Sequence, residues 1–176
     1  MTRRNILVTL TVLVSLFFLS GCMEDLGIVR NIKPDQIKHY DLQGTFVYGA
    51  VKTKPTTSIE RVMIYFKNGP DINLQLNNSY EPFLLDMPFT TQGISRFGFV
   101  YTDSDGEKKQ WIEKEIPFTI VSNKINYIGV FFFTEPDSFA PGKLTMTNYL
   151  EADKADCYSN YTQLTHYEFY PVELKK

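Results

Sequence analysis

The sequence predicts a mainly β domain, an antiparallel β-sandwich with one late helix, from two observations. Apolar and polar residues alternate through a series of short segments rich in valine, isoleucine and aromatic residues, which is typical of half-buried strands. Turn-forming residues stand between these segments, as they do in antiparallel sandwiches and barrels. A chain of 176 residues is long enough for one such domain, with a core that needs no disulfide or metal.

Five expected strands precede a strong hairpin signal. They cover residues 45–51, 62–66, 72–76, 83–85 and 97–101. The segment Asp103-Ser104-Asp105-Gly106 predicts the hairpin turn, because Asp-Gly readily supplies the positive φ angles that such turns need. Pro117 argues against a central position for the return strand. One face of that strand carries Ile112, Ile116, Phe118 and Ile120.

The last third contains the most apolar segment and the helix. Residues 125–134 (INYIGVFFFT) are apolar on both faces, so we expect a strand in the middle of a sheet, covered above and below. Residues 151–161 form the one plausible helix, and its apolar stripe is thin because Asp153 and Lys154 stand where another apolar contact belongs. The stripe consists of Leu150, Cys157, Tyr161 and Leu164. Further strands are expected at Leu144 and Met146, and as a closing edge strand at Tyr167, Phe169 and Pro171.

The N-terminal segment reads as an export signal. Two arginines, Arg3 and Arg4, precede a largely apolar run over residues 6–19, which is too short to cross a bilayer comfortably. The following residues, Leu19-Ser20-Gly21-Cys22, resemble the lipobox of bacterial lipoproteins: an aliphatic residue, two small residues and a cysteine. The alternative is an ordinary signal peptide in which Cys22 is incidental. The fit of all four positions favours the lipobox.

The resemblance to bacterial lipoproteins implies cleavage before Cys22 and attachment of acyl chains such as palmitate to this cysteine. Two or three acyl chains give stable membrane anchoring. In Gram-negative lipoproteins an aspartate after the cysteine tends to retain the protein in the inner membrane, and here that residue is Met23. The resemblance therefore implies a lipid-anchored protein of the cell envelope, in the outer membrane if the source is Gram-negative.

The predicted organisation is a signal peptide (residues 1–21), a lipidated tether (22–42) and a single β-sandwich domain (43–176). The order of elements resembles small β-sandwich lipoproteins of unknown function, of the transthyretin-like or immunoglobulin-like kind. Removal of residues 1–21 takes away two of 18 basic residues and none of the 20 acidic ones, so the net charge becomes 16 − 20 = −4. This weak negative charge argues against a nucleic-acid partner.

The acidic turn Asp103-Ser104-Asp105-Gly106-Glu107 raises the question of a calcium site. Its glycine stands fourth, whereas the helix-loop-helix calcium loop needs it at the sixth position. Lys108 and Lys109 follow at once and would repel a divalent cation. We therefore expect a hairpin turn and no metal site.

Residues that could carry catalysis are few. His39 and His166 have no metal-ligand spacing around them, and no glycine-rich phosphate loop or serine nucleophile motif is present. We therefore expect neither an enzyme nor a cofactor. With Cys22 acylated, Cys157 has no intrachain partner. A buried position as a small hydrophobe is favoured over a disulfide with another chain.

Tyrosines crowd the C-terminal third, and they favour one of two non-catalytic functions. The crowded positions are Tyr149, Tyr158, Tyr161, Tyr167 and Tyr170. These side chains either fill the core, which is favoured, or form a binding face. The predicted function is a membrane-anchored structural or interaction module with an envelope protein as partner. The alternative is a lipoprotein that binds a small glycan, lipid or hydrophobic molecule between the sheets or beneath the helix, near Phe131-Phe132-Phe133.

Overall fold

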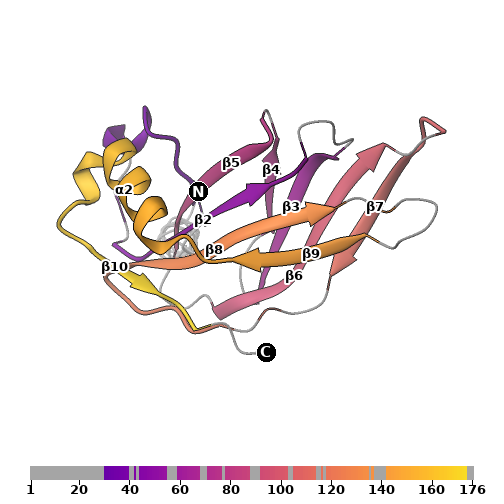
Figure 1. The fold of residues 1–176 in the computed structure, drawn as a ribbon. Coiled ribbons are helices and arrows are strands. Elements are labelled where there is room, and N and C mark those ends of the chain that lie inside the picture. Colours follow the sequence, from indigo (N-terminus) through magenta and orange to yellow (C-terminus); the bar gives the residue numbers. More distant parts are fainter. Residues whose placement is uncertain are drawn as a thin grey trace, which may run out of the picture.

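A computed structural model gives the positions of residues 30–39, 42, 44–54, 59–67, 71–76, 78–87, 92–102, 105–113, 116, 118–134, 136 and 142–173. Two sheets face each other, and helix α2 (Leu150–Asn160) covers the outer side of one of them at one end of the molecule (Figure 1). The predicted β-sandwich with one late helix is confirmed. No helix in the described ranges has both the length and the apolar character required to cross a membrane.

The larger sheet, sheet A, has the strand order β1-β5-β2-β8-β10, with β9 also paired to β8. Its members are β1 (Arg30–Asn31), β2 (Phe46–Lys52), β5 (Tyr80–Asp86), β8 (Lys124–Thr134), β9 (Lys143–Thr147) and β10 (Glu168–Pro171). Sheet B has the order β4-β3-β6-β7. Its members are β3 (Ile59–Lys67), β4 (Asp71–Gln75), β6 (Gln92–Thr102) and β7 (Lys108–Glu113).

Sheet B is antiparallel throughout, as the turn signals between successive strands predict. Strands β6 and β7 form the expected hairpin, with Thr102 opposite Lys108. Gly106 in its turn has φ +79°, which explains the glycine of the Asp-Gly pair. Asp103 and Ser104, the first two residues of the acidic turn considered above as a calcium site, lie outside the described residues.

Sheet A is mixed, which the antiparallel expectation did not include. Strand β8 runs parallel to β2 on one side and to β10 on the other. Parallel neighbours need a long crossover connection, and helix α2 lies in the connection from β8 to β10. The alternation of residues reports which face of a strand is buried, but it does not report the direction of the neighbouring strand.

Strand β8 is the central strand that its two apolar faces predict. Eight of its 11 residues are buried, and its apolar side chains reach two separate cores. Its first half pairs with β10 and its second half with β9. Gly129 lies between the two halves with φ +92°, and the pairing with β2 shifts register there. Tyr127, before the glycine, packs on the side of α2, whereas Phe131 and Phe133 point between the sheets.

The two cores make the domain a three-layer structure. The first core lies between the sheets and contains the aromatic side chains of Phe66, Phe83, Phe97, Phe99, Phe118, Phe131 and Phe133 among its members. The second core lies between sheet A and α2 and contains Ile32, Ile37, Phe46, Tyr48, Leu84, Ile125, Tyr127, Cys157, Tyr161, Leu164 and Phe169. The chain therefore buries both faces of sheet A around its centre.

The predicted tether over residues 22–42 is too long by at least ten residues, since residues 30–39 belong to the folded domain. Strand β1 pairs with β5, and the Ile32 amide donates to the Leu84 carbonyl at 2.8 Å. A short 3₁₀-helix, η1 (Ile37–His39), follows. Ile32 and Ile37 are both buried in the core beneath α2. Two isolated isoleucines in a charged segment have no recognisable period, and this is why the sequence did not reveal them.

Other boundaries agree closely with expectation, with one exception. Helix α2 is one residue offset from the predicted range, and β10 is an edge strand as expected. The predicted return strand is broken: β7 ends at Glu113, and Ile116 makes only an isolated bridge to Ile94. Ile116 and Phe118 nevertheless reach the core between the sheets, so their apolar character reports burial and not strand structure.

We expect Phe131→Ala to lower the free energy of unfolding by about 3–5 kcal/mol, because it removes a fully buried ring from the core between the sheets. Phe132→Ala, at the neighbouring half-buried position, removes the same atoms and should cost clearly less. Urea unfolding of both variants measures the difference. An equal loss of unfolding free energy in the two variants would contradict the assignment of Phe131 to the buried face of β8 and of Phe132 to its more exposed face.

Candidate functional site

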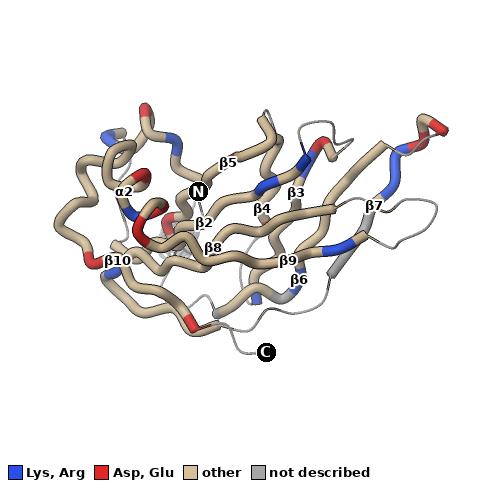
Figure 2. The backbone as a smooth tube through the Cα atoms, in the orientation of Figure 1, with Lys and Arg blue, Asp and Glu red and all other residues tan. Residues whose placement is uncertain are grey.

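The crowded tyrosines and the carboxylates of α2 meet on the outer side of sheet A. Figure 2 shows the acidic residues of α2 in red above the strands of this sheet. Asp153 is only 6% exposed, although it occupies a position where an apolar residue was expected. A buried carboxylate is unfavourable unless hydrogen bonds satisfy it, so its partners decide what this part of the molecule does.

Two tyrosines from different strands donate hydrogen bonds to Asp153. The Tyr80 hydroxyl, from β5, donates to Oδ1 at 3.2 Å, and the Tyr127 hydroxyl, from β8, donates to Oδ2. The Tyr127 oxygen in turn accepts the backbone amide of Tyr149 at 3.0 Å. One carboxylate and one phenol thus connect the first turn of α2 to two strands of sheet A. We call Tyr48, Tyr80, Tyr127, Asp153 and Asp156 the tyrosine–aspartate cluster.

The second half of the cluster ties the next turn of the helix to β2. The Tyr48 hydroxyl donates to Asp156 Oδ2 at 2.9 Å. The start of the helix has no side-chain cap from Tyr149, but Asn148 Oδ1 accepts the Leu150 amide at 2.9 Å. Strand residues and a flanking asparagine therefore supply the polar contacts that hold this helix in place.

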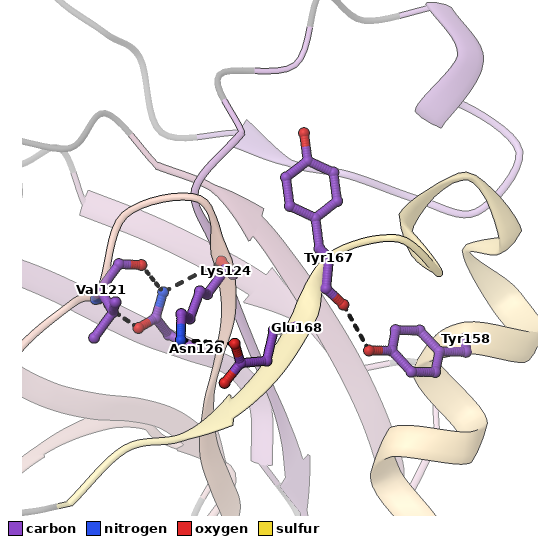
Figure 3. Close-up of polar contacts among 6 residues, drawn as sticks. All are labelled: Val121, Lys124, Asn126, Tyr158, Tyr167 and Glu168. Carbon is purple, nitrogen blue, oxygen red and sulfur yellow. Dashed lines mark hydrogen bonds and ion pairs between the residues drawn. The ribbon is translucent and has the colours of Figure 1, made fainter.

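The last turn of α2 is held from two further directions. The Tyr161 hydroxyl donates to the Ile32 carbonyl at 2.8 Å, so the segment after β1 is joined to the end of the helix. The Tyr158 hydroxyl donates to the Tyr167 carbonyl at 2.7 Å, next to β10 (Figure 3). After α2, the 3₁₀-helix η2 (Thr162–Leu164) leads the chain back into sheet A.

The entry into β8 is fixed by the buried side chain of Asn126. Its Oδ1 accepts the Val121 amide at 2.7 Å, and its Nδ2 donates to the carbonyls of Phe46 and Val121 at 3.0 and 2.9 Å. Beside it, Lys124 pairs with Glu168 of β10 at 2.8 Å (Figure 3). These bonds satisfy a buried amide and align β8 with β2 and β10.

The chemistry of the cluster suits structure better than proton transfer. Burial and the Asp156 hydrogen bond raise the pKa of Tyr48, and burial together with Asp153 raises the pKa of Tyr80 and Tyr127. All three phenols therefore keep their protons at neutral pH and act as hydrogen-bond donors. A general base would need a group that releases and takes up protons near the working pH.

The other predicted candidates do not come together. His39 and His166 are exposed, and His166 stacks on the Tyr167 ring at 4.3 Å between centroids. Cys157 is buried, as favoured, and desolvation raises the pKa of its thiol to about 12, so the nucleophilic thiolate is not formed at neutral pH. No group of three or more His, Cys, Asp or Glu within the described ranges could hold a metal.

Of the five crowded tyrosines, some lie in or against the core, and others lie partly or largely at the surface. Tyr161 is buried in the core beneath α2, as the core interpretation predicts, and Tyr158 and Tyr167 pack partly against that core. Tyr170 is half-buried, and the Lys124 ammonium lies 4.9 Å from its ring centre. Tyr149 is 51% exposed and lies just after β9, where Met146 is 45% exposed. This junction carries the two most exposed large apolar side chains of the described part.

Aromatic rings occupy the two places where a ligand was expected in the alternative hypothesis. Between the sheets, the ring centroids of Phe97 and Phe131 are 4.4 Å apart, and those of Phe99 and Phe133 are 5.1 Å apart. Beneath α2, the rings of Tyr127 and Phe169 are 5.3 Å apart. These distances are those of packed aromatic pairs, so the described rings contact one another there.

The comparisons with known proteins give little. No protein-family model matches the chain, and no curated protein matches it. Among solved structures, the chain is similar to an NMR structure of a protein from Eubacterium rectale, at 13% sequence identity, over 62% of this chain and 94% of that chain, with a TM-score of 0.34.

We expect Tyr127→Phe to lower the free energy of unfolding by about 1–3 kcal/mol, because it leaves the Tyr149 amide without its acceptor and Asp153 with one donor fewer. The ring, and hence the apolar burial, is unchanged. Tyr149→Phe removes a hydroxyl from a half-exposed side chain and should change stability by less than about 0.5 kcal/mol. Chemical unfolding compares the two, and an unaffected Tyr127→Phe variant would refute the role of the cluster.

The raised phenol pKa values predict a loss of stability in alkali. In the unfolded chain these tyrosines ionise near 10.0, whereas in the folded chain they stay protonated to higher pH. Their stabilising contribution is therefore complete below about pH 10 and falls as pH rises above it. Urea midpoints measured at increasing pH should decline, and Tyr48→Phe should make the decline shallower. An unchanged slope in Tyr48→Phe would contradict this assignment.

Proposed function

We propose that this protein is a lipid-anchored protein of the bacterial envelope and that its folded domain is a non-catalytic interaction module. The observation that carries the proposal is the motif Leu19-Ser20-Gly21-Cys22 directly after an apolar export segment. The motif lies outside the described residues. Acylation of Cys22 would attach the chain to a membrane, and the resemblance to lipoproteins makes the outer membrane the expected one in a Gram-negative cell.

The use of the polar side chains supports a non-catalytic domain. The buried carboxylate Asp153 accepts hydrogen bonds from strand tyrosines, and the buried amide Asn126 is satisfied by the backbone. The thiol of Cys157 is protonated at neutral pH, and the histidines are exposed. Each of these candidates for chemistry has a structural explanation, which favours binding to another molecule as the task of the domain.

The short connection to the lipid supports a domain held close to the membrane. Cys22 and Arg30, the first residue of β1, are 30 − 22 = 8 residues apart. A fully extended chain of this length spans at most about 29 Å. The β1 edge of sheet A would therefore stay within one domain diameter of the bilayer, and partners would be proteins that also lie at the membrane surface.

We expect labelled palmitate to mark the wild-type protein in growing cells and to be absent from Cys22→Ala, because the thiol of Cys22 is the acceptor of the lipid. Cys157→Ala is the matched control, since it removes the other cysteine of the chain and should keep the label. Label that persists in Cys22→Ala, or that is lost only in Cys157→Ala, would refute the anchor.

The interaction itself is tested on the same membranes. A tagged wild-type protein, solubilised in mild detergent, should bring down a stoichiometric envelope partner, either another protein or an untagged copy of the same chain. Cys22→Ala with the same signal should recover less of that partner, because it no longer shares the membrane surface. If the wild-type protein is labelled with palmitate but binds no partner, the proposed anchor stands and the proposed interaction module is refuted.

A further inference from the structure

Strand β9 is an edge strand of sheet A among the strands that the structure describes. It pairs with β8 along one side, and no strand in the described part of the chain pairs with its other side. An edge strand presents backbone N–H and C=O groups that can pair with another strand. Met146, in this strand, is 45% exposed, which is unusual for a large apolar side chain.

Three other sheet edges differ from that of β9. Exposed lysines, Lys108 and Lys109, lie on β7, which begins in blue in Figure 2. Exposed polar residues alternate with buried apolar ones along β4. The two-residue strand β1 pairs with Leu85 and Asp86 at one end of β5. Strand β9 has a single lysine, Lys143, at its beginning, and the rest of its sequence is Leu-Thr-Met-Thr. Of the devices that keep edges from pairing, only this one charge is present on β9.

We propose that β9 pairs with β9 of a second copy of this chain, antiparallel and centred on Thr145, so that sheet A continues through a twofold dimer. In this register Thr145 faces Thr145 of the other copy, Leu144 faces Met146, and Lys143 faces Thr147. The proposal deepens the interaction function proposed above by naming the partner, and it rests on that function only for the membrane anchor.

The backbone pattern of β9 is compatible with this register. Along an edge strand, every second residue directs its N–H and C=O away from the sheet. Centring on Thr145 pairs odd-numbered residues with odd-numbered ones and even-numbered residues with even-numbered ones. Whichever set points away from β8, it therefore meets itself across the dimer, and all five residues of β9 have a partner.

The side chains complement each other in the same register. Leu144 packs against the core between the sheets, and Met146, opposite Phe131, lies on the same face. A Leu144–Met146 contact between copies would join the two cores and cover the exposed methionine. Each Lys143 faces a threonine and not the other Lys143, so no like charges are opposed across the pair.

Two five-residue strands bury little surface, so the dimer should be weak in dilute solution. Anchoring in one membrane confines both copies to a thin layer and raises their effective concentration. The proposed lipid at Cys22 would thus favour pairing on the membrane, and this is where the contact should be trapped.

The test is thiol cross-linking of the full chain in isolated membranes with a short bis-maleimide. With Cys22 acylated and Cys157 buried, Thr145→Cys introduces the one accessible thiol on the described surface. It should yield a covalent dimer. Asn73→Cys, on the edge strand β4, is the matched control and should stay monomeric. Adding Met146→Lys to Thr145→Cys should abolish the dimer, because it places a charge opposite Leu144.

The register has its own test. Thr147→Cys alone should cross-link poorly, because residue 147 faces residue 143, whereas co-expressed Thr147→Cys and Lys143→Cys should form the mixed dimer. This pair also decides the matter if Thr145→Cys folds badly. The proposal is overturned if neither Thr145→Cys nor the mixed pair exceeds Asn73→Cys. Palmitate labelling of the same membranes reports separately on the anchor, so a failed dimer and a failed anchor are distinguished.

Discussion

The hydrogen bonds from Tyr80 and Tyr127 to the Asp153 carboxylate are the interaction on which the last third of the fold depends. Only Asp153 and Cys157 of helix α2 are buried, so its buried apolar surface alone is small. The carboxylate compensates because Tyr80 and Tyr127 satisfy it, and Tyr127 also places its ring in the second core. If the helix did not dock there, the outer side of sheet A would be uncovered and β10 would lose the connection that makes it parallel to β8.

Buried polar groups also explain why this arrangement is specific. An apolar helix could slide over an apolar sheet with modest loss. The Asp153 oxygens, in contrast, need the hydroxyl donors of the strand tyrosines, and the Asn126 amide needs its backbone donor and acceptors. A satisfied buried network favours one packing, because every displaced alternative leaves a polar atom unpaired. The buried polar residues of this domain therefore make one packing arrangement more favourable than the alternatives.

Sequence patterns predicted the positions of the strands better than they predicted which strands pair and in which direction. The apolar run at 125–134 located the central strand, because a strand buried on both faces has apolar residues at successive positions. It could not indicate that β2 and β10 run parallel to that strand, since strand direction leaves no mark on side-chain period. Ile32 and Ile37 were assigned to the tether because two isolated residues show no period. Asp153 looked like a defect in the apolar stripe, and the tyrosines that could have explained it come from strands far away in the sequence.

The long sequence separation between paired strands of sheet A limits how fast this protein can fold. Phe46 of β2 pairs with Ile125 of β8, 125 − 46 = 79 residues later, and Ile125 also pairs with Phe169, 169 − 125 = 44 residues later still. Pairings of such long range carry a large loop-closure entropy and slow the folding of β proteins. The central strand cannot obtain its last neighbour until nearly the whole chain has been synthesised. Until Phe169 and its neighbours have been synthesised, the first half of β8 lacks its β10 neighbour.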